Sequence, residues 1–378
     1  SKSYSNLQDV SVAGFPSCAE AEGDDAFEEA LRGDKPFLRR GDAAAIFTPD
    51  PFHAPIARRL IQAGIHVLIT KPVVQRLDEL YTLTDALRGT PVHSHVELHK
   101  RFDPLYADAI TKAQSPTDFG HLTHFHGYMS QPRAQLQTFA AWAGRSSDIS
   151  YYLNSHHVDV LLCMALRQGL VPTTVSAVGA RGVASRELPN APQSIEDAIT
   201  LCISLRDPAT GRAASGVLTS CWTAPRSDVH SQQRFFAVGS AGQIEIDQAR
   251  RGYSHSTDAR GYASVNPLFM KYTPAPDGSF DGALGYGYRS IAHFVRAVAW
   301  GEADDVSRLA AVNSPEVEWA TAILEAGRRS LDADGAKVTL ARSPESDGRI
   351  TLTVDGVDST TATASSGSSS SSKRARDE

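Results

Sequence analysis

Polar segments that could do chemistry directly follow apolar runs typical of buried strands. Lys71 and Pro72 follow the run His66–Thr70, and Thr48 follows the run Ala43–Phe47. A lysine just before a proline that ends a buried strand can donate a hydrogen bond to a substrate oxygen, and desolvation can lower its pKa toward neutral pH. A solvated lysine at the start of a loop is the alternative interpretation of the same spacing.

The third strand candidate, Pro91–Leu98, runs into a polar segment, Glu97–Pro104, that contains His99 and Arg101. Open parallel sheets bind ligands at the carboxyl ends of their strands. If the three apolar runs are parallel strands of one sheet, their polar segments meet at one edge of that sheet. The sequence therefore predicts a ligand site at this edge.

His156 is the candidate general base in the second half of the chain. It lies three residues before Asp159 on a predicted helix from about Asn154 to Leu166, and residues at this spacing are neighbours on a helix face. One interpretation is a base oriented by an acid. The other is a capping cluster in which Asn154 is the N-cap. The adjacent His157 points elsewhere, and we expect it to be structural.

A row of histidines raises the question of a metal site. His93, His95 and His99 alternate with Glu97 along one predicted strand. Side chains on one face of a strand are ~6.5 Å apart, whereas bonds to a metal ion are ~2 Å long. One ion could therefore accept at most two neighbours of the row, and we expect no metal site.

The first part of the chain alternates short apolar runs with amphipathic segments of helical periodicity. Helix candidates at Ala54–Ala63 and Leu77–Leu87 separate the three apolar runs, and another precedes them at Asp25–Leu31. Strands alternating with short helices are typical of βαβ units in a parallel sheet. We therefore expect a partial Rossmann domain, a doubly wound parallel sheet, over residues 1–118.

From about residue 119 the pattern changes to a succession of strand-like segments. These segments are residues 121–129, 173–183, 197–205, 216–224 and 234–247, with a hairpin candidate at 336–342 and 349–354. Two closing helices are predicted at Tyr286–Trp300 and Ser314–Leu331. The pattern is typical of a large, mainly antiparallel sheet. The expected fold class is α/β plus α+β, with an open-sheet domain over 119–357.

An open sheet with helices on one face leaves the other face able to bind a partner. Phe235, Val238, Ile244 and Ile246 belong to one strand-rich segment of the predicted sheet. We expect a homodimer or a larger homo-oligomer formed through this domain.

The composition argues against several classes of protein. The 378 residues include 37 Lys and Arg and 43 Asp and Glu, a net charge of −6, whereas nucleic-acid-binding proteins carry a basic patch. No apolar run is long enough for a membrane span, and the first residues do not resemble a signal peptide. The four scattered cysteines favour a reducing compartment, the cytoplasm. Residues 358–378 are rich in Ser and Thr, and we expect a disordered tail.

The strongest signal in the sequence is the order Thr-Pro, His and Lys-Pro within residues 43–72, which read AAAIFTPDPFHAPIARRLIQAGIHVLITKP. This segment resembles the central signature of the glucose-fructose oxidoreductase / inositol dehydrogenase (Gfo/Idh/MocA) family. Later segments resemble further motifs of that family, so that the resemblance covers about residues 27–332. They are VELHKRFDPLY, SHHVDVLL, FAVGSAGQIEID, YGYRSIAHFVRAV and ATAILEAGRRSL.

The resemblance implies a Rossmann domain followed by an open-sheet domain, with the active site between them. It implies an oxidoreductase that transfers a hydride between NAD or NADP and a sugar, polyol or related cyclic alcohol. The resemblance also implies roles for individual residues. Lys71 and His156 would be catalytic, the lysine on the reacting oxygen and the histidine carrying the proton. The cofactor-binding residues would be Thr48, Pro49, His53, Lys71, Pro72 and His99. The substrate-binding residues would be Tyr152, Asn154, Arg101 and Asp159.

The sequence departs from the family pattern in three places. No G-x-G-x-x-G motif and no starting Met occur, so we expect an N-terminal truncation that removes the first βαβ unit with its phosphate-binding glycine loop. Thr70 stands where the signature has Glu. Tyr152 stands where many dehydrogenases of the family have Asp, and a tyrosine with a reference pKa of about 10 is a poor base at neutral pH. His156 is therefore the best candidate for the general base.

Two other functions are compatible with the same resemblance. Some members of the family are non-catalytic regulators of sugar pathways that use a dinucleotide only as a ligand, and others are redox-assisted glycosidases. Tyr152 fits the regulator, whereas the presence of both Lys71 and His156 favours the dehydrogenase.

Overall fold

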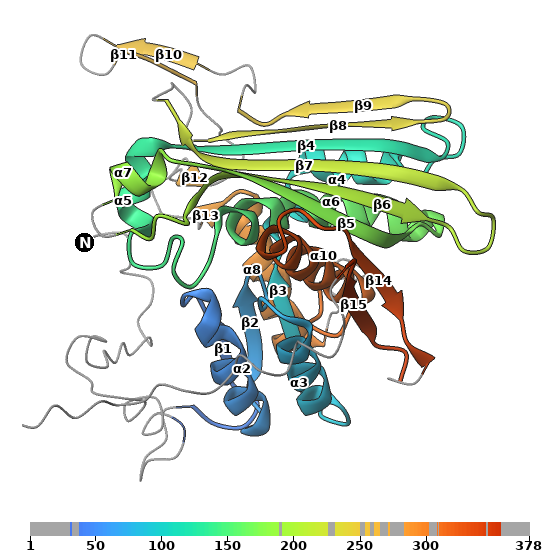
Figure 1. Ribbon diagram of the computed structural model, residues 1–378. Helices are drawn as coiled ribbons and strands as arrows, with labels where there is room; N and C mark the ends of the chain where they lie inside the picture. The colour runs from blue at the N-terminus through green and yellow to red at the C-terminus, as the bar shows by residue number, and fades with distance from the viewer. Residues whose placement is uncertain are drawn as a thin grey trace, which may run out of the picture.

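The structure is a computed structural model of the chain (Figure 1). Three expectations concern residues that the structure does not describe. They are the helix at Asp25–Leu31 apart from its last residue, the loss of the first βαβ unit, and the tail at 358–378. The described residues are 31, 38–188, 191–225, 231–249, 285–301, 308, 310–344 and 347–356, together with the backbone of the short strands β10 (Ser254–Thr257), β11 (Gly261–Ser264), β12 (Lys271–Tyr272) and β13 (Ala283–Leu284).

Three parallel strands, β1 (Ala43–Ile46), β2 (His66–Thr70) and β3 (Ser94–Glu97), form a small sheet in the order β1-β2-β3. The three middle residues of β2 are each at most 1% exposed. A central parallel strand is covered on both faces, which is why β2 reads as a continuous apolar run. The predicted Rossmann-like parallel sheet is confirmed.

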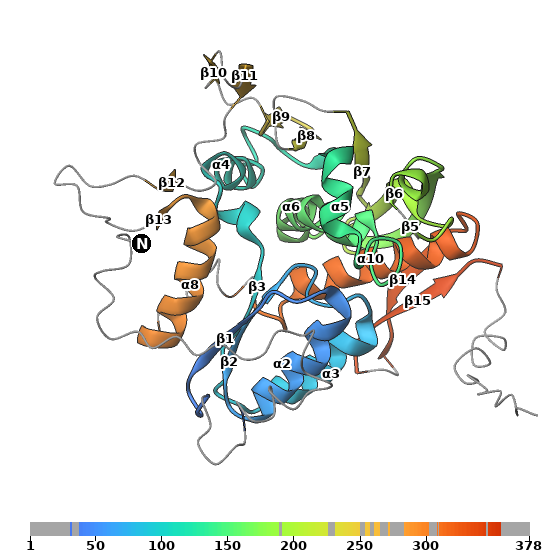
Figure 2. The ribbon, with the colours of Figure 1, turned by 90° about the vertical axis from the view of Figure 1, so that its left-hand side faces the viewer.

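Helices cover both faces of this sheet. α2 (His53–Gln62) and α3 (Leu77–Leu87) lie on one side, and α8 (Tyr286–Trp300), which comes from the other end of the chain, contacts β2 and β3 from the opposite side (Figure 2). The predicted boundary between residues 118 and 119 lies in the link that follows α4 (Pro104–Lys112). The first sheet is therefore completed by a helix from beyond that boundary.

The free edge of β3 is also completed by late residues. The backbone N–H of Val96 donates to the carbonyl oxygen of Ala310 at 2.8 Å, and the N–H of Val312 donates to the Ser94 hydroxyl at 3.3 Å. Residues more than two hundred positions apart in the sequence thus share one sheet edge.

The second sheet has eight strands in the order β15-β14-β5-β6-β7-β4-β8-β9, and every neighbouring pair is antiparallel except β4 and β7. This confirms the predicted large, mainly antiparallel open sheet. The strands are β4 (Leu122–Pro132), β5 (Val171–Arg181), β6 (Glu196–Arg206), β7 (Ala213–Ala224), β8 (Gln232–Gly239), β9 (Gln243–Asp247), β14 (Val338–Arg342) and β15 (Ile350–Val354).

Helices lie against one face of this sheet, below it in Figure 1. They are α4, α6 (Ser155–Ala165) and α10 (Pro315–Asp332). Every residue of α6 is buried, because it packs between the sheet, α4 and α10. Short elements that the sequence did not predict are η4 (Arg133–Gln135), α5 (Leu136–Phe139), η6 (Leu166–Gln168) and α7 (Ala184–Glu187).

The apolar residues singled out for the open face need correction. Phe235 and Ile246 are 2% and 8% exposed and lie on the helix-covered side, where the Phe235 ring stacks on Phe125 at 5.1 Å. The next residue, Phe236, contacts His124 on the other face. Side chains alternate between the two faces along a strand, so Phe235 and Ile246 lie on the covered face, whereas Val238, two residues after Phe236, lies with it on the open face.

Candidate active site

Lys71 lies at the carboxyl edge of the parallel sheet because it directly follows β2. Its amine donates a hydrogen bond to the backbone oxygen of Tyr152 and lies 4.3 Å from the centre of the Tyr152 ring. Lys71 therefore joins the first sheet to the helical segment that begins α6. The predicted convergence of these two distant segments is present in the structure.

The environment of Lys71 lowers the pKa of its amine to about 8. Burial is the main cause, and the carboxylates of Asp50 and Glu97 partly offset it. Glu97 is near because Thr70 of β2 is paired in register with Glu97 of β3. An amine with this pKa is mostly protonated at neutral pH and releases its proton more readily than an exposed lysine.

His53 connects the carboxyl ends of β1 and β2. Its ring is completely buried, with Nε2 at 2.8 Å from the carbonyl oxygen of Thr48 and Nδ1 at 2.9 Å from that of Pro72. A neutral imidazole has one N–H and could donate to only one of these oxygens. His53 thus lies behind the site, between the backbone carbonyl groups of Thr48 and Pro72, and in its neutral form donates to one of them.

The Thr48 side chain has an atom suited to a ligand. Its Oγ1 is buried and has no hydrogen-bond partner among the described residues. Leaving a buried hydroxyl unpaired costs about 1–3 kcal/mol, so the atom fits a polar group bound at the edge of the sheet. The neighbouring Phe47 and Phe52 are 59% and 56% exposed and flank the same strand end.

The helix that carries His156 begins differently from the prediction. A π-helical turn, η5 (Ser150–Asn154), runs directly into α6, and Asn154 has a helical backbone and no capping hydrogen bond. Asp148 accepts the N–H groups of Ser150 and Tyr151 at 2.8 and 3.0 Å and so caps the continuous helix. The proposed N-cap role of Asn154 is therefore wrong. Its side chain donates instead to the Ser150 hydroxyl at 3.0 Å.

His156 is deeply buried, at 6% exposure, and its Nδ1 atom has no hydrogen-bond partner among the described residues. Burial is the main cause that lowers the pKa of His156 well below its ordinary value, and the nearby Lys71, His99 and Lys100 lower it further. The imidazole is therefore neutral near pH 7 and able to accept a proton. Its ring centre lies 4.9 Å from that of His99.

Asp159 does not orient His156, because it binds Arg101. The two side chains are 1% and 4% exposed and form a bidentate ion pair, with Nε–Oδ2 at 2.9 Å and Nη2–Oδ1 at 2.5 Å. This pair joins η3 (His99–Phe102) to α6. Arg101 and Asp159 thus position the two histidines.

His157 is structural, as its sequence position suggested. Burial lowers the pKa of His157 to about 3. Its Nε2 lies 3.2 Å from the hydroxyl of Tyr106. The ring packs in the core between the sheet and α4.

Tyr152 packs by its ring against Phe139 and Trp142, with centres 4.9 and 5.5 Å away. Burial raises the pKa of Tyr152 above its ordinary value of 10. The phenol is therefore a neutral hydrogen-bonding group at physiological pH, which agrees with the expectation that it is not the base.

Sequence reasoning missed a second buried lysine beside His156. Lys100 is 2% exposed, and its amine donates to the side-chain oxygens of Gln233 and Gln248. These glutamines lie far along the chain from Lys100, on β8 and just after β9. Only the three-dimensional arrangement brings them together.

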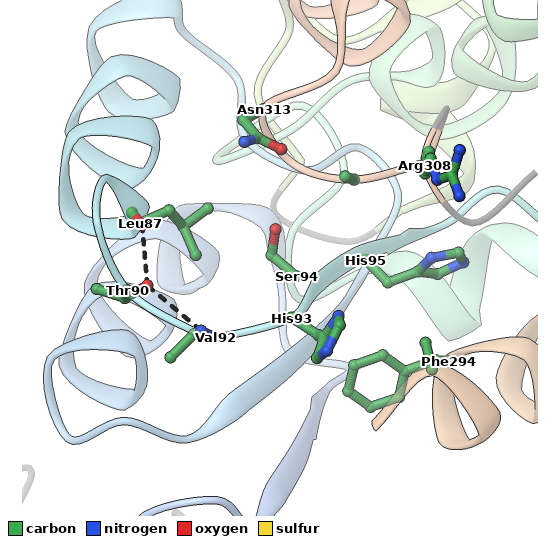
Figure 3. A pocket seen from close by; sticks show the side chains of 11 residues that line it. Leu87, Thr90, Val92, His93, Ser94, His95, Phe294, Arg308 and Asn313 are labelled. Carbon is green, nitrogen blue, oxygen red and sulfur yellow. Dashed lines mark hydrogen bonds between the residues drawn. The ribbon is translucent and has the colours of Figure 1, made fainter. Parts of the chain in front are cut away.

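Two of the cavities among the described residues are not lined by Lys71 or His156. One of about 220 Å³ is at the amino end of β3, between His93, Phe294 and Asn313, and so on the edge of the sheet opposite Lys71 (Figure 3). The other, of about 440 Å³, lies beside Gln75 and Tyr151 and is lined by arginine and carboxylate side chains. Within the part of the chain that the structure describes, no group of three His, Cys, Asp or Glu side chains could hold a metal ion. Nor is any helix there long and apolar enough to cross a membrane.

The first part of the chain matches a known protein family. The family model described as "Oxidoreductase family, NAD-binding Rossmann fold" (GFO_IDH_MocA) matches residues 9–98. These residues include the Thr-Pro, His and Lys-Pro positions that meet at the edge of the sheet. Residues 9–98 are thus similar to the Gfo/Idh/MocA oxidoreductases.

A curated protein similar to part of this chain is the scyllo-inositol 2-dehydrogenase (NAD(+)) of Bacillus subtilis (strain 168). The two are 26% identical over 103 residues, which are 27% of this chain and 30% of the relative. The matched region thus spans about a third of the relative's length.

Solved structures of similar fold cover most of the chain. Myo-inositol 2-dehydrogenase from Lactobacillus plantarum has a TM-score of 0.62 at 18% identity and 83% coverage of each chain. Scyllo-inositol dehydrogenase from Lactobacillus casei, with bound NAD(H) and scyllo-inositol, has a TM-score of 0.61 at 16% identity and 83% coverage of each chain. GenD2 from gentamicin A biosynthesis, in complex with NAD, has a TM-score of 0.59 at 21% identity, covering 82% of this chain and 80% of that one.

Proposed function

We propose that this protein is an NAD-dependent dehydrogenase that interconverts a secondary hydroxyl and a carbonyl on a cyclic polyol or sugar. The observation that carries the proposal is the meeting of Lys71 and His156. One follows the central strand of the NAD-binding sheet, and the other begins the helix beneath the second sheet. The family match over residues 9–98 and the inositol dehydrogenases among the similar proteins support the substrate class.

The two residues supply complementary proton chemistry. The Lys71 ammonium donates a hydrogen bond to the reacting oxygen, which takes the place of the Tyr152 carbonyl as its acceptor. Neutral His156 accepts the proton of the substrate hydroxyl as the carbonyl forms. Charge that develops on the oxygen is stabilised by the lysine in a buried site, where such an interaction is strong.

The residues present fit the nicotinamide end of the cofactor. Thr48 would hold it through its buried, unpartnered Oγ1, beside Pro49, Pro72 and His99, while His53 acts through the backbone of Thr48 and Pro72. Bound nicotinamide supplies the hydride acceptor or donor of the reaction. Tyr152 and Asn154 would place neighbouring substrate hydroxyls, and Arg101 and Asp159 would keep the two halves of the site together.

The test is turnover by the purified protein. NAD+ or NADP+ at saturating concentration is mixed with myo-inositol, scyllo-inositol and a panel of monosaccharides, and reduced nicotinamide is followed by its absorbance. We expect reduction with at least one cyclic polyol. A matched control is Lys112→Ala, which removes an exposed lysine of α4 paired with Asp108 and should keep full activity. Absence of turnover with every substrate, together with binding of sugar or dinucleotide, would instead identify a non-catalytic regulator.

A further inference from the structure

The cavity of about 220 Å³ at the amino end of β3 lies where several parts of the chain meet (Figure 3). Its walls come from β3, from the residues that follow α3, from α8 and from the segment 308–313, which pairs with the edge of β3. Pockets for drug-sized ligands measure about 300–1,000 Å³. This cavity is smaller, so it fits a small molecule.

One part of the wall is polar and basic. The side chains of His93, His95 and Arg308 line it, and none of the described residues that line the cavity is acidic. His95 is 3% exposed, so this part of the wall reaches into the interior. A guanidinium is positively charged at every physiological pH, and a histidine gains a positive charge as the pH falls through the neutral range. The basic part of the wall therefore favours an anionic group.

Two uncharged side chains can add hydrogen bonds to the same anion. The Ser94 hydroxyl oxygen accepts the backbone N–H of Val312 at 3.3 Å, so its own O–H remains to be donated. The Ser94 hydroxyl points from β3 toward the segment that carries Asn313, whose amide N–H₂ group is a second donor (Figure 3). The two oxygens of a carboxylate can accept several such bonds and that of a guanidinium at once.

The rest of the wall is apolar. It includes Leu87, Phe294 and Ala297, which are 8%, 4% and 5% exposed, together with Ala311. The Phe294 ring centre lies 6.3 Å from that of His95, so the apolar and basic parts adjoin. Apolar surface stabilises a hydrocarbon group, because contact removes both from water, but it offers nothing to a hydrated ion such as phosphate. The wall therefore fits a molecule with an anionic end and an apolar body.

We propose that this cavity binds a small carboxylic acid with an apolar or aromatic body, a ligand distinct from the substrate and the cofactor. The carboxylate lies against Arg308, Ser94 and Asn313, and the hydrocarbon body lies against Phe294. The cavity is at the amino edge of the parallel sheet, whereas Lys71 follows its carboxyl edge. The ligand therefore does not compete for the candidate active site, and the inference does not depend on the proposed function.

A ligand in this cavity contacts two elements that also reach the candidate active site. β3 ends at Glu97, just before His99, and α8 begins at Tyr286, whose ring stacks on His99 with 5.9 Å between the centres. The bound molecule fills the space between these elements near the amino end of β3. A ligand that binds only the folded arrangement stabilises it, so binding should strengthen the packing of α8 on the first sheet.

The first test uses benzoate as the probe and the full chain. Isothermal titration calorimetry measures the binding of benzoate, of neutral benzamide and of inorganic phosphate, and benzoate is titrated again at saturating NADH. We expect one benzoate per chain, bound about tenfold or more tightly than either other probe, as expected for a hydrogen-bonded charge. Its Kd should be the same with NADH.

Each opposite result would overturn the proposal. Benzamide that binds as well as benzoate would show that the basic side chains do not hold the carboxylate. Phosphate that binds as well as benzoate would show that the apolar wall contributes nothing. Competition with NADH would place benzoate in the cofactor site, and the absence of benzoate binding would refute the ligand class outright.

The second test locates the bound probe with two variants that act independently. Arg308→Gln, at an exposed position, should weaken benzoate about tenfold or more and leave benzamide nearly unchanged. Ala311→Leu fills the cavity and should abolish benzoate binding. The matched control Arg289→Gln removes an exposed arginine of α8 that does not line the cavity, and it should bind benzoate as the parent does. Parental affinity in either test variant, folded by circular dichroism, would overturn the site.

Discussion

Arg101 and Asp159 form a buried, bidentate ion pair that joins η3 to α6. Arg101 follows His99 by two residues, and Asp159 follows His156 by three. The ion pair thus fastens together the two segments that carry His99 and His156, whose rings are in contact. The sequence suggested that Asp159 orients His156 directly. Instead, Asp159 acts through its ion pair with Arg101.

Asp159→Asn should destabilise the protein strongly. The substitution leaves the Arg101 guanidinium buried without a counter-charge, and breaking a buried ion pair on one side costs about 3–5 kcal/mol. Urea unfolding followed by tryptophan fluorescence measures the change in the free energy of unfolding. The double variant Arg101→Met/Asp159→Leu, which removes both charges, should recover most of the loss. A single variant as stable as the parent would contradict the account of this pair.

The pKa of Lys71 predicts how stability depends on alkaline pH. The folded protein holds this proton with a pKa of about 8, below the unfolded value of about 10.4. Between these pH values the unfolded state binds more protons, so this group makes the protein more stable as pH rises through that window. Lys71→Met should be more stable than the parent at pH 7, by the order of 1–3 kcal/mol, and the difference should shrink between pH 8 and 10. A difference that is constant with pH would show that the amine is not perturbed.

The catalytic residues should be separable by kinetics once a substrate is identified. Lys71→Ala and His156→Ala should each lower kcat by about a hundredfold or more, the scale of a lost charge-stabilising donor or general base. Tyr152→Phe should have a smaller effect, because its neutral phenol only orients substrate. The Kd for NADH, measured by fluorescence, should hardly change in His156→Ala. A Lys71→Ala enzyme that keeps nearly full kcat would rule out the mechanism.

We expect the uncovered face of the large sheet to form a homodimer or larger oligomer. Phe236 lies on this face against His124 and His126, and Val178 is 66% exposed. Phe236→Arg should shift the sedimentation coefficient toward that of the monomer, because two copies would meet with like charges. The control Lys112→Glu, on α4, should not change it. A parent protein that sediments as a monomer at micromolar concentration would contradict the expectation.

The elements whose pattern is local were predictable from the sequence. β2 and α3 begin and end at the predicted residues. A buried strand and an amphipathic helix can each be recognised from the spacing of their apolar residues. The convergence of Lys71 and His156 was expected from the family motifs. The π-turn before α6 was not, because its helical hydrogen bonds have no distinctive residue pattern. Nor were the partners of Asp159 and Glu97, because buried polar pairs form between residues distant in sequence.

The edge of β3 has a consequence for how the chain is made. Val96 pairs its backbone with Ala310, and α8 covers the same sheet. Ribosomes add roughly 5–20 residues per second, so roughly 10–40 s pass between the synthesis of β3 and that of Ala310, which pairs with it. During that interval the apolar side of the first sheet is open to chaperones and to other nascent chains. A chain that stops before residue 312 would lack part of the segment that pairs with the edge of β3.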